Sequence, residues 1–236
     1  MISLASIDGV SANTGVIYVN DSSGNDSWDG ESDVWDGIGT VGPKKSIKNA
    51  TGTVTDGGIV NIADGLYSGE NNANITIEKN MTIKGQSREG TIINGSNSAQ
   101  IFLIKSNITV IIQNLTITNG NGSSGGAIYN DGTLSLSEAS FTFNNAVFGG
   151  AISNQGNITM DNSSFIENTA ISPGVGGAIF NYGNLSINNS IFNKNSAIAN
   201  SYISAYGGAI FNVGDLKITN CAFNNNTGLN LVAGSS

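Results

Sequence analysis

One short block of sequence occurs four times in this chain, and it restricts the possible folds more than any other feature. The copies read GGAIYN, GGAISN, GGAIFN and GGAIFN, and they begin at Gly125, Gly149, Gly176 and Gly207. Sixteen residues after its first glycine, each copy is followed by a phenylalanine that opens a second motif, F-x-x-N. A repeat of this period is typical of a stacked architecture, in which one unit cannot bury its apolar face alone. A solenoid is therefore expected.

Within each unit, apolar and polar residues alternate. The alternating segments LSLS, ITMD, LSIN and LKIT begin at Leu134, Ile158, Leu185 and Leu216. A period of two predicts strands with one face turned inward. Weaker anchors at Met81 and Ile108 extend the pattern to about six coils. With three short strands per coil, this predicts an all-β fold, a single right-handed parallel β-helix over residues 59–236 that is clearest at 125–228. Residues 1–58 are assigned to a leader and an N-terminal cap.

Equivalent residues of successive coils are expected to form columns through the stack. An isoleucine column contains Ile128, Ile152, Ile179 and Ile210, and a phenylalanine column contains Phe141, Phe165, Phe192 and Phe223. One asparagine column contains Asn130, Asn154, Asn181 and Asn212, and another contains Asn144, Asn168, Asn195 and Asn226. Stacked asparagines can satisfy backbone groups of neighbouring coils. Asparagines that serve only as turn residues would occupy the same positions, so the two interpretations stay open.

Length variation is confined to one edge of the repeat. After Ala146, Ala170 and Ala197 the chain inserts VF, ISPGV and IANSYISAY before the next glycine pair. Insertions in solenoids map to loops on one face, which is often a binding face. Aromatic residues at this edge are the candidate partner-binding residues: Tyr129, Phe180, Tyr202, Tyr206 and Phe211. They could stack on sugar rings or anchor a protein partner, or they could pack beneath the inserted loops.

The first eighty residues have a different composition. Four acidic residues, Asp21, Asp26, Asp29 and Asp33, lie close together in a stretch rich in glycine and serine. Such clusters of oxygen ligands can hold calcium, but their spacing fits no EF-hand loop, and a solvated acidic loop is the competing interpretation. Pro43 then introduces KKSIKNA, a predicted short helix with the proline in its first turn. A helix here would cover the open end of the stack.

The charge balance and the missing residue types disfavour several functions. The chain has 9 Lys and Arg against 17 Asp and Glu, and a net charge of −8 disfavours nucleic acid or anionic membrane as a partner. Without histidine, and with Cys221 as the single cysteine, zinc sites and nucleophilic catalysis lack their usual residues. Cys221 occupies a repeat position filled elsewhere by alanine or serine, which indicates a small core residue. No apolar run reaches the length of a membrane span.

The acidic residues of the repeats are scattered. From Gly125 onward they are Asp131, Glu138, Asp161, Glu167 and Asp215. Glycoside hydrolysis needs two carboxylates about 5–10 Å apart. Aligned by repeat, no two of these acids fall in one column of adjacent coils, whereas Glu167 lies over Lys194 and predicts an exposed ion pair.

Fourteen N-x-S/T sequons are present. One interpretation is surface glycosylation of a secreted protein. The other is that the sequons are a by-product of the repeat, in which a corner asparagine precedes alternating Ser or Thr.

The paired GGAI and F-x-x-N repeats resemble those of the chlamydial polymorphic membrane proteins. The richness in Asn, Ser and Thr resembles the adhesin-like surface proteins of methanogenic archaea. The entry segment, from YVNDSSGNDSWDG to MTIKG, is similar to the opening of many β-helix proteins of the pectate-lyase-like group. The resemblance implies a secreted or surface-displayed β-helix, often adhesive. Further repeats or an anchor are expected C-terminal to this segment.

Two classes of function remain open. The resemblance implies a non-catalytic, extracellular, adhesin-like module that needs no cofactor. Such a module would bind a protein or glycan of a host or neighbouring cell through the loops of one edge. The alternative is a polysaccharide lyase or glycoside hydrolase, because pectate-lyase-like helices commonly are such enzymes. The scattered carboxylates favour the first class.

Overall fold

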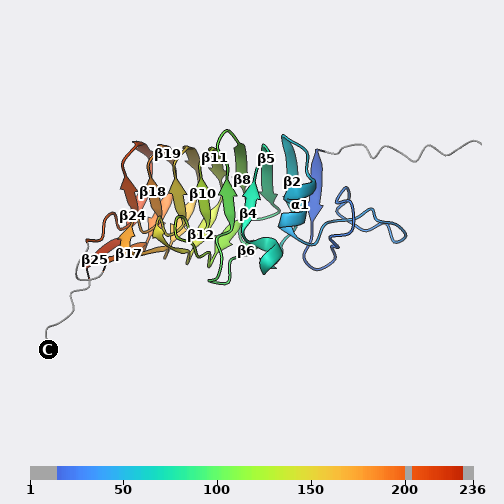
Figure 1. Cartoon of the computed structure of the whole chain (residues 1–236), viewed down its shortest axis with the longest axis horizontal. Coiled ribbons are helices and arrows are strands. Elements are labelled where there is room, and N and C mark those ends of the chain that lie inside the picture. The colour runs from blue at the N-terminus through green and yellow to red at the C-terminus, as the bar shows by residue number, and fades with distance from the viewer. Residues whose placement is uncertain (1–14, 200–203, 231–236) are drawn as a thin grey trace, which may run out of the picture.

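The repeats stack into a parallel β-helix, as expected (Figure 1). The computed structural model describes residues 15–199 and 204–230. Every strand pair in these residues is parallel, and the coils follow one another along the long axis, with α1 (Ile47–Thr53) at the N-terminal end. From Met81 onward the first sheet contains six consecutive strands, which is the predicted number of coils.

Within the described residues the strands form four sheets, and the bounds follow the order along each sheet. The first sheet contains β1 (Val16–Val19), β2 (Gly58–Ile62), β5 (Met81–Gly85), β8 (Thr109–Gln113), β11 (Thr133–Ser137), β15 (Asn157–Asp161), β19 (Asn184–Asn188) and β23 (Asp215–Thr219). The second contains β3 (Gly65–Ser68), β6 (Thr91–Asn94), β9 (Thr116–Thr118), β12 (Ser140–Thr142), β16 (Ser164–Ile166), β20 (Ile191–Asn193) and β24 (Ala222–Asn224). The third contains β4 (Ile75–Ile77), β7 (Phe102–Ile104), β10 (Ile128–Asn130), β14 (Ile152–Asn154), β18 (Ile179–Asn181) and β22 (Ile210–Asn212). The fourth contains β13 (Asn145–Phe148), β17 (Thr169–Val175), β21 (Ser196–Ala199) and β25 (Thr227–Asn230).

The phenylalanine column forms the predicted interior stack, in which Phe141, Phe165 and Phe192 are completely buried and Phe223 of the last coil is 43% exposed. Phe141, Phe165, Phe192 and Phe223 pair in register, and successive ring centroids lie 4.8 Å apart with nearly parallel planes. That distance is the spacing of neighbouring strands, so each ring rests on the ring of the next coil. The isoleucine column is also in register, and Ile128, Ile152 and Ile179 are completely buried. Each buried Phe contributes about 1.5–3 kcal/mol through the hydrophobic effect.

Both asparagine columns are hydrogen-bonded ladders. In each ladder, Nδ2 of one asparagine donates to Oδ1 of its equivalent in the next coil. The Nδ2···Oδ1 distances are 2.7, 2.7 and 2.6 Å along Asn130, Asn154, Asn181 and Asn212, and 2.9 Å at each step along Asn144, Asn168, Asn195 and Asn226. The same amides also donate to backbone carbonyls, as Asn130 does to Gly132. The structure therefore confirms stacking over the interpretation as turn residues only.

Two corners of the coil require left-handed backbone. One corner column contains Asn114, Glu138, Asn162, Asn189 and Asn220, and the other contains Asn119, Phe143, Glu167, Lys194 and Asn225, all with φ between 47° and 61°. Asparagine tolerates this conformation better than other residues with a side chain. The corners therefore account for three of the N-x-S/T sequons, which begin at Asn114, Asn162 and Asn225.

The register of one early coil differs from the prediction. Val110, and not Ile108, pairs with Leu134, and Ile117 pairs with Phe141 of the phenylalanine column. Ile108 and Val110 share one phase of the alternation, so a shift of two residues keeps the same face inward. The period of two identified the buried face there, but it could not identify which of the two residues pairs with Leu134.

The N-terminal end is covered as predicted, with a different start of the helix. α1 begins at Ile47 with Ser46 as its N-cap, so Pro43 precedes the helix and does not lie in its first turn. α1 packs on β1 and β2, and Ile47 and Ala50 are completely buried. A short 3-10 helix, η1 (Glu70–Asn72), also contacts α1. β1 pairs with β2, so the first sheet extends into the segment assigned to the leader and cap.

Candidate functional site

The edge at which the repeats vary in length is a fourth sheet. The inserted residues extend strands, because Phe148 of β13 pairs with Val175 of β17, and Val175 forms a bridge to Tyr206. Insertions of successive coils lie beside one another, and pairing satisfies their backbone N–H and C=O groups. These coils therefore contain one strand more than the three expected, and the VF and ISPGV insertions are not loops.

Aromatic side chains pack together where the third and fourth sheets meet. The ring of Phe180 lies 5.3 Å from that of Phe148, 5.3 Å from that of Tyr182 and 5.7 Å from that of Phe211. The ring of Tyr206 lies 6.0 Å from that of Phe211. We call these five residues the aromatic edge. Offset and tilted ring pairs at such distances attract one another beyond their buried area, so the five rings stabilise one another.

The predicted partner-binding residues occupy different environments. Phe180 is 9% exposed and forms the base of the aromatic edge, whereas Tyr206 is 51% exposed at its rim. Phe211 and Tyr129 are half-buried, and Tyr202 lies outside the described residues. Burial, and then the neighbouring Asp131, raise the pKa of Tyr129, which keeps its hydroxyl protonated as a hydrogen-bond donor. The rim, and not the base, is therefore accessible to a partner.

Sequence reasoning missed two members of the aromatic edge. Tyr182 is 53% exposed and follows the ladder residue Asn181, in a repeat position where the other coils carry Asp, Gln or Val. Phe148 lies in the shortest insertion. Neither position repeats as an aromatic residue, so periodicity gave no signal for them. The insertion VF itself was the available hint for Phe148.

The four calcium candidates serve separate backbone groups. Asp26 accepts hydrogen bonds from the N–H groups of Lys45 and Ser46 and from the Ser46 hydroxyl. Asp29 accepts from the N–H groups of Glu31 and Gly42. Asp21 accepts from the N–H of Leu66. Asp33 is exposed and lines a surface pocket. Over residues 15–199 and 204–230, no three carboxylate, thiol or imidazole groups are close enough together to hold a metal ion.

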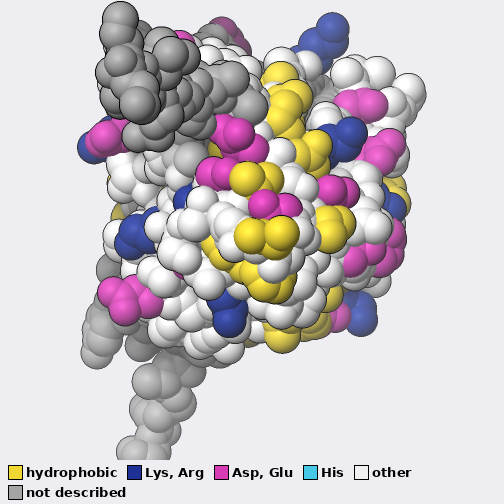
Figure 2. Space-filling view, turned by 90° about the vertical axis from the view of Figure 1, so that its right-hand side faces the viewer, with side chains coloured by type: hydrophobic (Ala, Val, Ile, Leu, Met, Phe, Trp, Pro, Cys, Tyr) yellow, Lys and Arg dark blue, Asp and Glu magenta, His cyan; other side chains and the backbone are white. Residues whose placement is uncertain are grey.

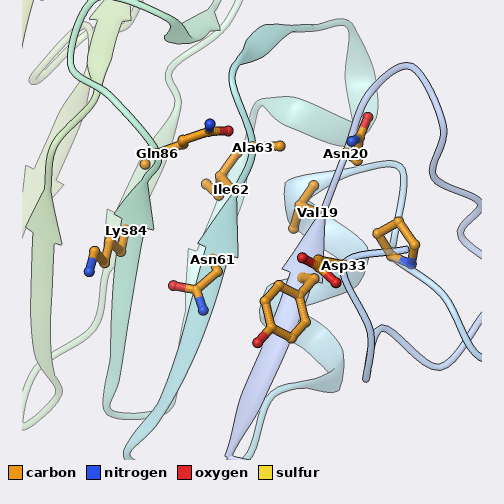
Figure 3. Close-up of a pocket in the computed structure, with 11 residues that line it drawn as sticks. Val19, Asn20, Asp33, Asn61, Ile62, Ala63, Lys84 and Gln86 are labelled. Atoms are coloured by element: carbon orange, nitrogen blue, oxygen red, sulfur yellow. The ribbon is translucent and has the colours of Figure 1, made fainter. Parts of the chain in front are cut away.

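A pocket of about 420 Å³ lies on the outer face of the first sheet, beside the cap. Figure 3 shows Asn61 and Lys84 on neighbouring strands, with Asp33 beside Val19 on the side of the cap loop. Tyr18, Asn61 and Lys84 pair in register across β1, β2 and β5, which places their side chains on one row. Amide, ammonium and carboxylate groups can hydrogen-bond a polar ligand. Among the residues that the structure describes, Asp33 is the one carboxylate lining this pocket, whereas glycoside hydrolysis uses a pair of carboxylates.

The acids of the repeats lie beside non-acidic residues in the pairing register. Asp161 lies between Ser137 and Asn188, and Asp215 pairs with Asn184. The predicted exposed ion pair is present, with 3.4 Å between Lys194 Nζ and Glu167 Oε1. Such an exposed pair contributes at most about 1 kcal/mol.

Cys221 packs partly buried against the core, and its thiol donates to the carbonyl of Thr219 at 3.1 Å. This agrees with its interpretation as a small core residue. None of the helices in the part of the chain that the structure describes has the length and apolarity needed to cross a bilayer.

Comparisons with known proteins leave the family open. No family model matches the chain, and no curated protein matches it. Among solved structures, the chain is similar to a pectin methylesterase mutant crystallised with a hexasaccharide, with a TM-score of 0.45 and 17% identity. The similarity covers 78% of this chain and 55% of the pectin methylesterase chain, so this chain spans about half the length of that enzyme. At this level the likeness assigns neither activity nor ligand.

Proposed function

We propose that this chain is an extracellular, non-catalytic module of adhesin type, which contacts a protein or glycan of another cell surface through the aromatic edge. The β-helix acts as a stiff spacer, and the fourth sheet holds the contact residues at one side of it. The proposal needs no cofactor. It extends the resemblance of the repeats to surface proteins, and its physical support comes from the side chains of the edge.

The observation that carries the proposal is the arrangement of the two tyrosines at the rim. Tyr182 and Tyr206 are each about half exposed, and each packs against a phenylalanine of the aromatic edge, Phe180 and Phe211 respectively. A tyrosine held in this way offers a ring face and a hydroxyl at little cost in side-chain entropy. Such residues bind proteins and glycans well because the free surface is already in its binding conformation.

Substitution of both rim tyrosines by serine tests the proposal. The variant Tyr182→Ser/Tyr206→Ser should keep its far-UV circular dichroism and lose binding to a glycan array and to intact cells. Leu66→Ser is a matched control, because Leu66 is 54% exposed on β3, away from the edge. Equal binding by the control and the double variant would remove the aromatic edge from consideration. Deleting residues 198–206 is a poorer test, since Ile198 pairs with Ile171 and Leu229.

The enzyme alternative has a direct test of its own. Incubation of the purified chain with pectin, polygalacturonate and related polymers, with and without calcium, should release no product. Amide variants of Asp161 and Glu167 would be compared first, because both acids lie in the same coil. Asp161 is the last residue of β15, and Glu167 is the corner residue that follows β16. Product release that disappears in Asp161→Asn or Glu167→Gln would replace the adhesin proposal with a carbohydrate-active enzyme.

A further inference from the structure

The loop between β1 and α1 presents large apolar side chains to solvent at the N-terminal end of the rod. The exposed fractions are 68% for Val34, 47% for Trp35, 94% for Ile38 and 40% for Val41. We call these four residues the cap tip. Figure 2 views this end and shows hydrophobic side chains gathered near its centre, with acidic side chains beside them. Single exposed apolar residues are ordinary, but a contiguous group marks an interaction site.

The cap tip is held in one conformation by its own hydrogen bonds. The indole N–H of Trp35 donates to the carbonyl of Gly39 at 3.1 Å, and the N–H of Asp36 donates to the carbonyl of Val41 at 3.1 Å. The Asp36 carboxylate accepts from the N–H groups of Ile38 and Gly39. An ordered loop binds with a smaller loss of entropy than a flexible one. The exposure of these side chains is therefore built into the loop.

The surroundings of the cap tip are acidic. The loop between β1 and α1, residues 20–46, contains six Asp and Glu against two lysines, Lys44 and Lys45, and the ammonium group of Lys44 donates to the backbone carbonyls of Asp26 and Trp28. Two of these acids, Asp33 and Asp36, are exposed within the same turn region as the apolar side chains. Hydrogen bonds from the backbone N–H groups of Gly39 and Ile38 lower the pKa of Asp36, so its charge is present at neutral pH. A partner that covers the cap tip must therefore bring positive charge beside apolar surface.

The chemistry of the four side chains disfavours a glycan or an anionic membrane here. Trp35 stacks on Trp28, with ring centroids 5.4 Å apart, so one ring face is covered, and its indole N–H is already bonded. The other three residues are branched aliphatics, which give a sugar neither a ring face nor a hydrogen bond. An anionic lipid surface would be repelled by the acids around the loop.

We propose that the cap tip is a docking surface for a polypeptide segment of a partner protein, in which apolar side chains are flanked by Lys or Arg. The apolar side chains of that segment would cover Val34, Trp35, Ile38 and Val41, and its cations would lie beside Asp33 and Asp36. This contact is separate from the aromatic edge and adds a second interaction site at the end of the rod.

Tryptophan fluorescence reports on this surface alone, because the chain has two tryptophans and both lie in this loop. The probe is a synthetic peptide in which Leu and Lys alternate, titrated into the full chain. We expect a saturable blue shift of the emission. Two control peptides each lack one of the two interactions: one alternates Leu and Glu, and the other alternates Ser and Lys. The affinity of each should be lower than that of the Leu/Lys peptide by about tenfold or more.

Variants locate the contact. Ile38→Ser should weaken binding of the Leu/Lys peptide by about tenfold, and it removes a side chain that is 94% exposed, so the fold is unaffected. Leu66→Ser, on β3, should bind like the parent chain. Equal affinity for the Ser/Lys peptide, or an unchanged affinity of Ile38→Ser, would overturn the proposal. A tryptophan emission that changes with protein concentration would also overturn the proposal, because a second copy of the chain would then be the occupant. An equal blue shift with zwitterionic lipid vesicles would do the same, because a membrane would then be the occupant.

Discussion

Replacing one interior rung of an asparagine ladder should destabilise the fold far more than replacing an exposed asparagine. Asn168 is completely buried, and its Oδ1 accepts from the backbone N–H and Nδ2 of Asn144. Its Nδ2 donates to the Phe141 carbonyl and to Asn195 Oδ1. Asn168→Ala therefore removes four hydrogen bonds and leaves the buried backbone N–H of Asn144 unpaired, whereas Nδ2 of Asn144 keeps its bond to the Ile117 carbonyl. At about 0.5–1.5 kcal/mol for each of the four bonds, we expect a loss of about 2–6 kcal/mol, and the unpaired buried N–H places it in the upper part of that range.

Asn184→Ala is the matched control. Asn184 also donates from Nδ2 to an asparagine of the neighbouring coil, Asn157, at 2.7 Å, but both residues are exposed. Water can replace that bond, so the expected loss is below about 1 kcal/mol. Urea unfolding followed by far-UV circular dichroism measures both variants, and the slope of each transition is compared because solenoids can unfold in parts. Similar losses for the two variants would refute the reasoning that burial makes the ladder important.

Three further predictions concern single positions. Phe143 is 53% exposed with φ 55°, so Phe143→Asn should raise the free energy of unfolding by about 1 kcal/mol in the same urea assay. Gly149 has φ 64°, and a Cβ there would overlap the carbonyl of Ile152, so Gly149→Ala should give little soluble protein. Gly52→Ala in α1 meets no neighbouring atom and should stabilise by about 0.5–1 kcal/mol, which makes it the control. Because the folded-state pKa of Asp36 is lowered, its ionised form stabilises the cap tip at neutral pH. This stabilisation should disappear as the pH falls through the lowered pKa, and a red shift of the tryptophan emission would report the loss.

The repeated positions were predictable because each coil solves one packing problem with the same residue. Phe165 must fill the space between two identical rings, and Asn154 must bond two identical neighbours, so the sequence repeats both. A column of this kind is visible without coordinates. The error at Ile108 arose where no such marker exists, since β8 has apolar residues on both faces and pairs equally well by alternation after a shift of two residues.

The edge and the cap were less predictable because their structure depends on contacts that do not repeat. The fourth sheet forms because insertions of different length lie side by side, and pairing of Phe148 with Val175 involves a shift of register. Tyr182 is exposed at a position where other coils carry unrelated residues. The acids near Asp26 suggested calcium, but their oxygens accept backbone N–H groups that the loop must satisfy. Composition alone does not distinguish these two uses of a carboxylate.

The two asparagine ladders give the rod a direction. In the six amide-to-amide bonds, Nδ2 donates toward the coil that follows, so both ladders have the same polarity and their bonds polarise one another. At the first rung, Asn130 Oδ1 is buried without a hydrogen-bond partner among the described residues. Ile104 pairs with Asn130, so an asparagine engineered at position 104 would point its donor at that oxygen. Adding a rung to this ladder before Asn130 therefore requires a hydrogen-bond donor, whereas adding one after Asn212 requires an acceptor. The two ends of the ladder are chemically distinct and cannot be exchanged.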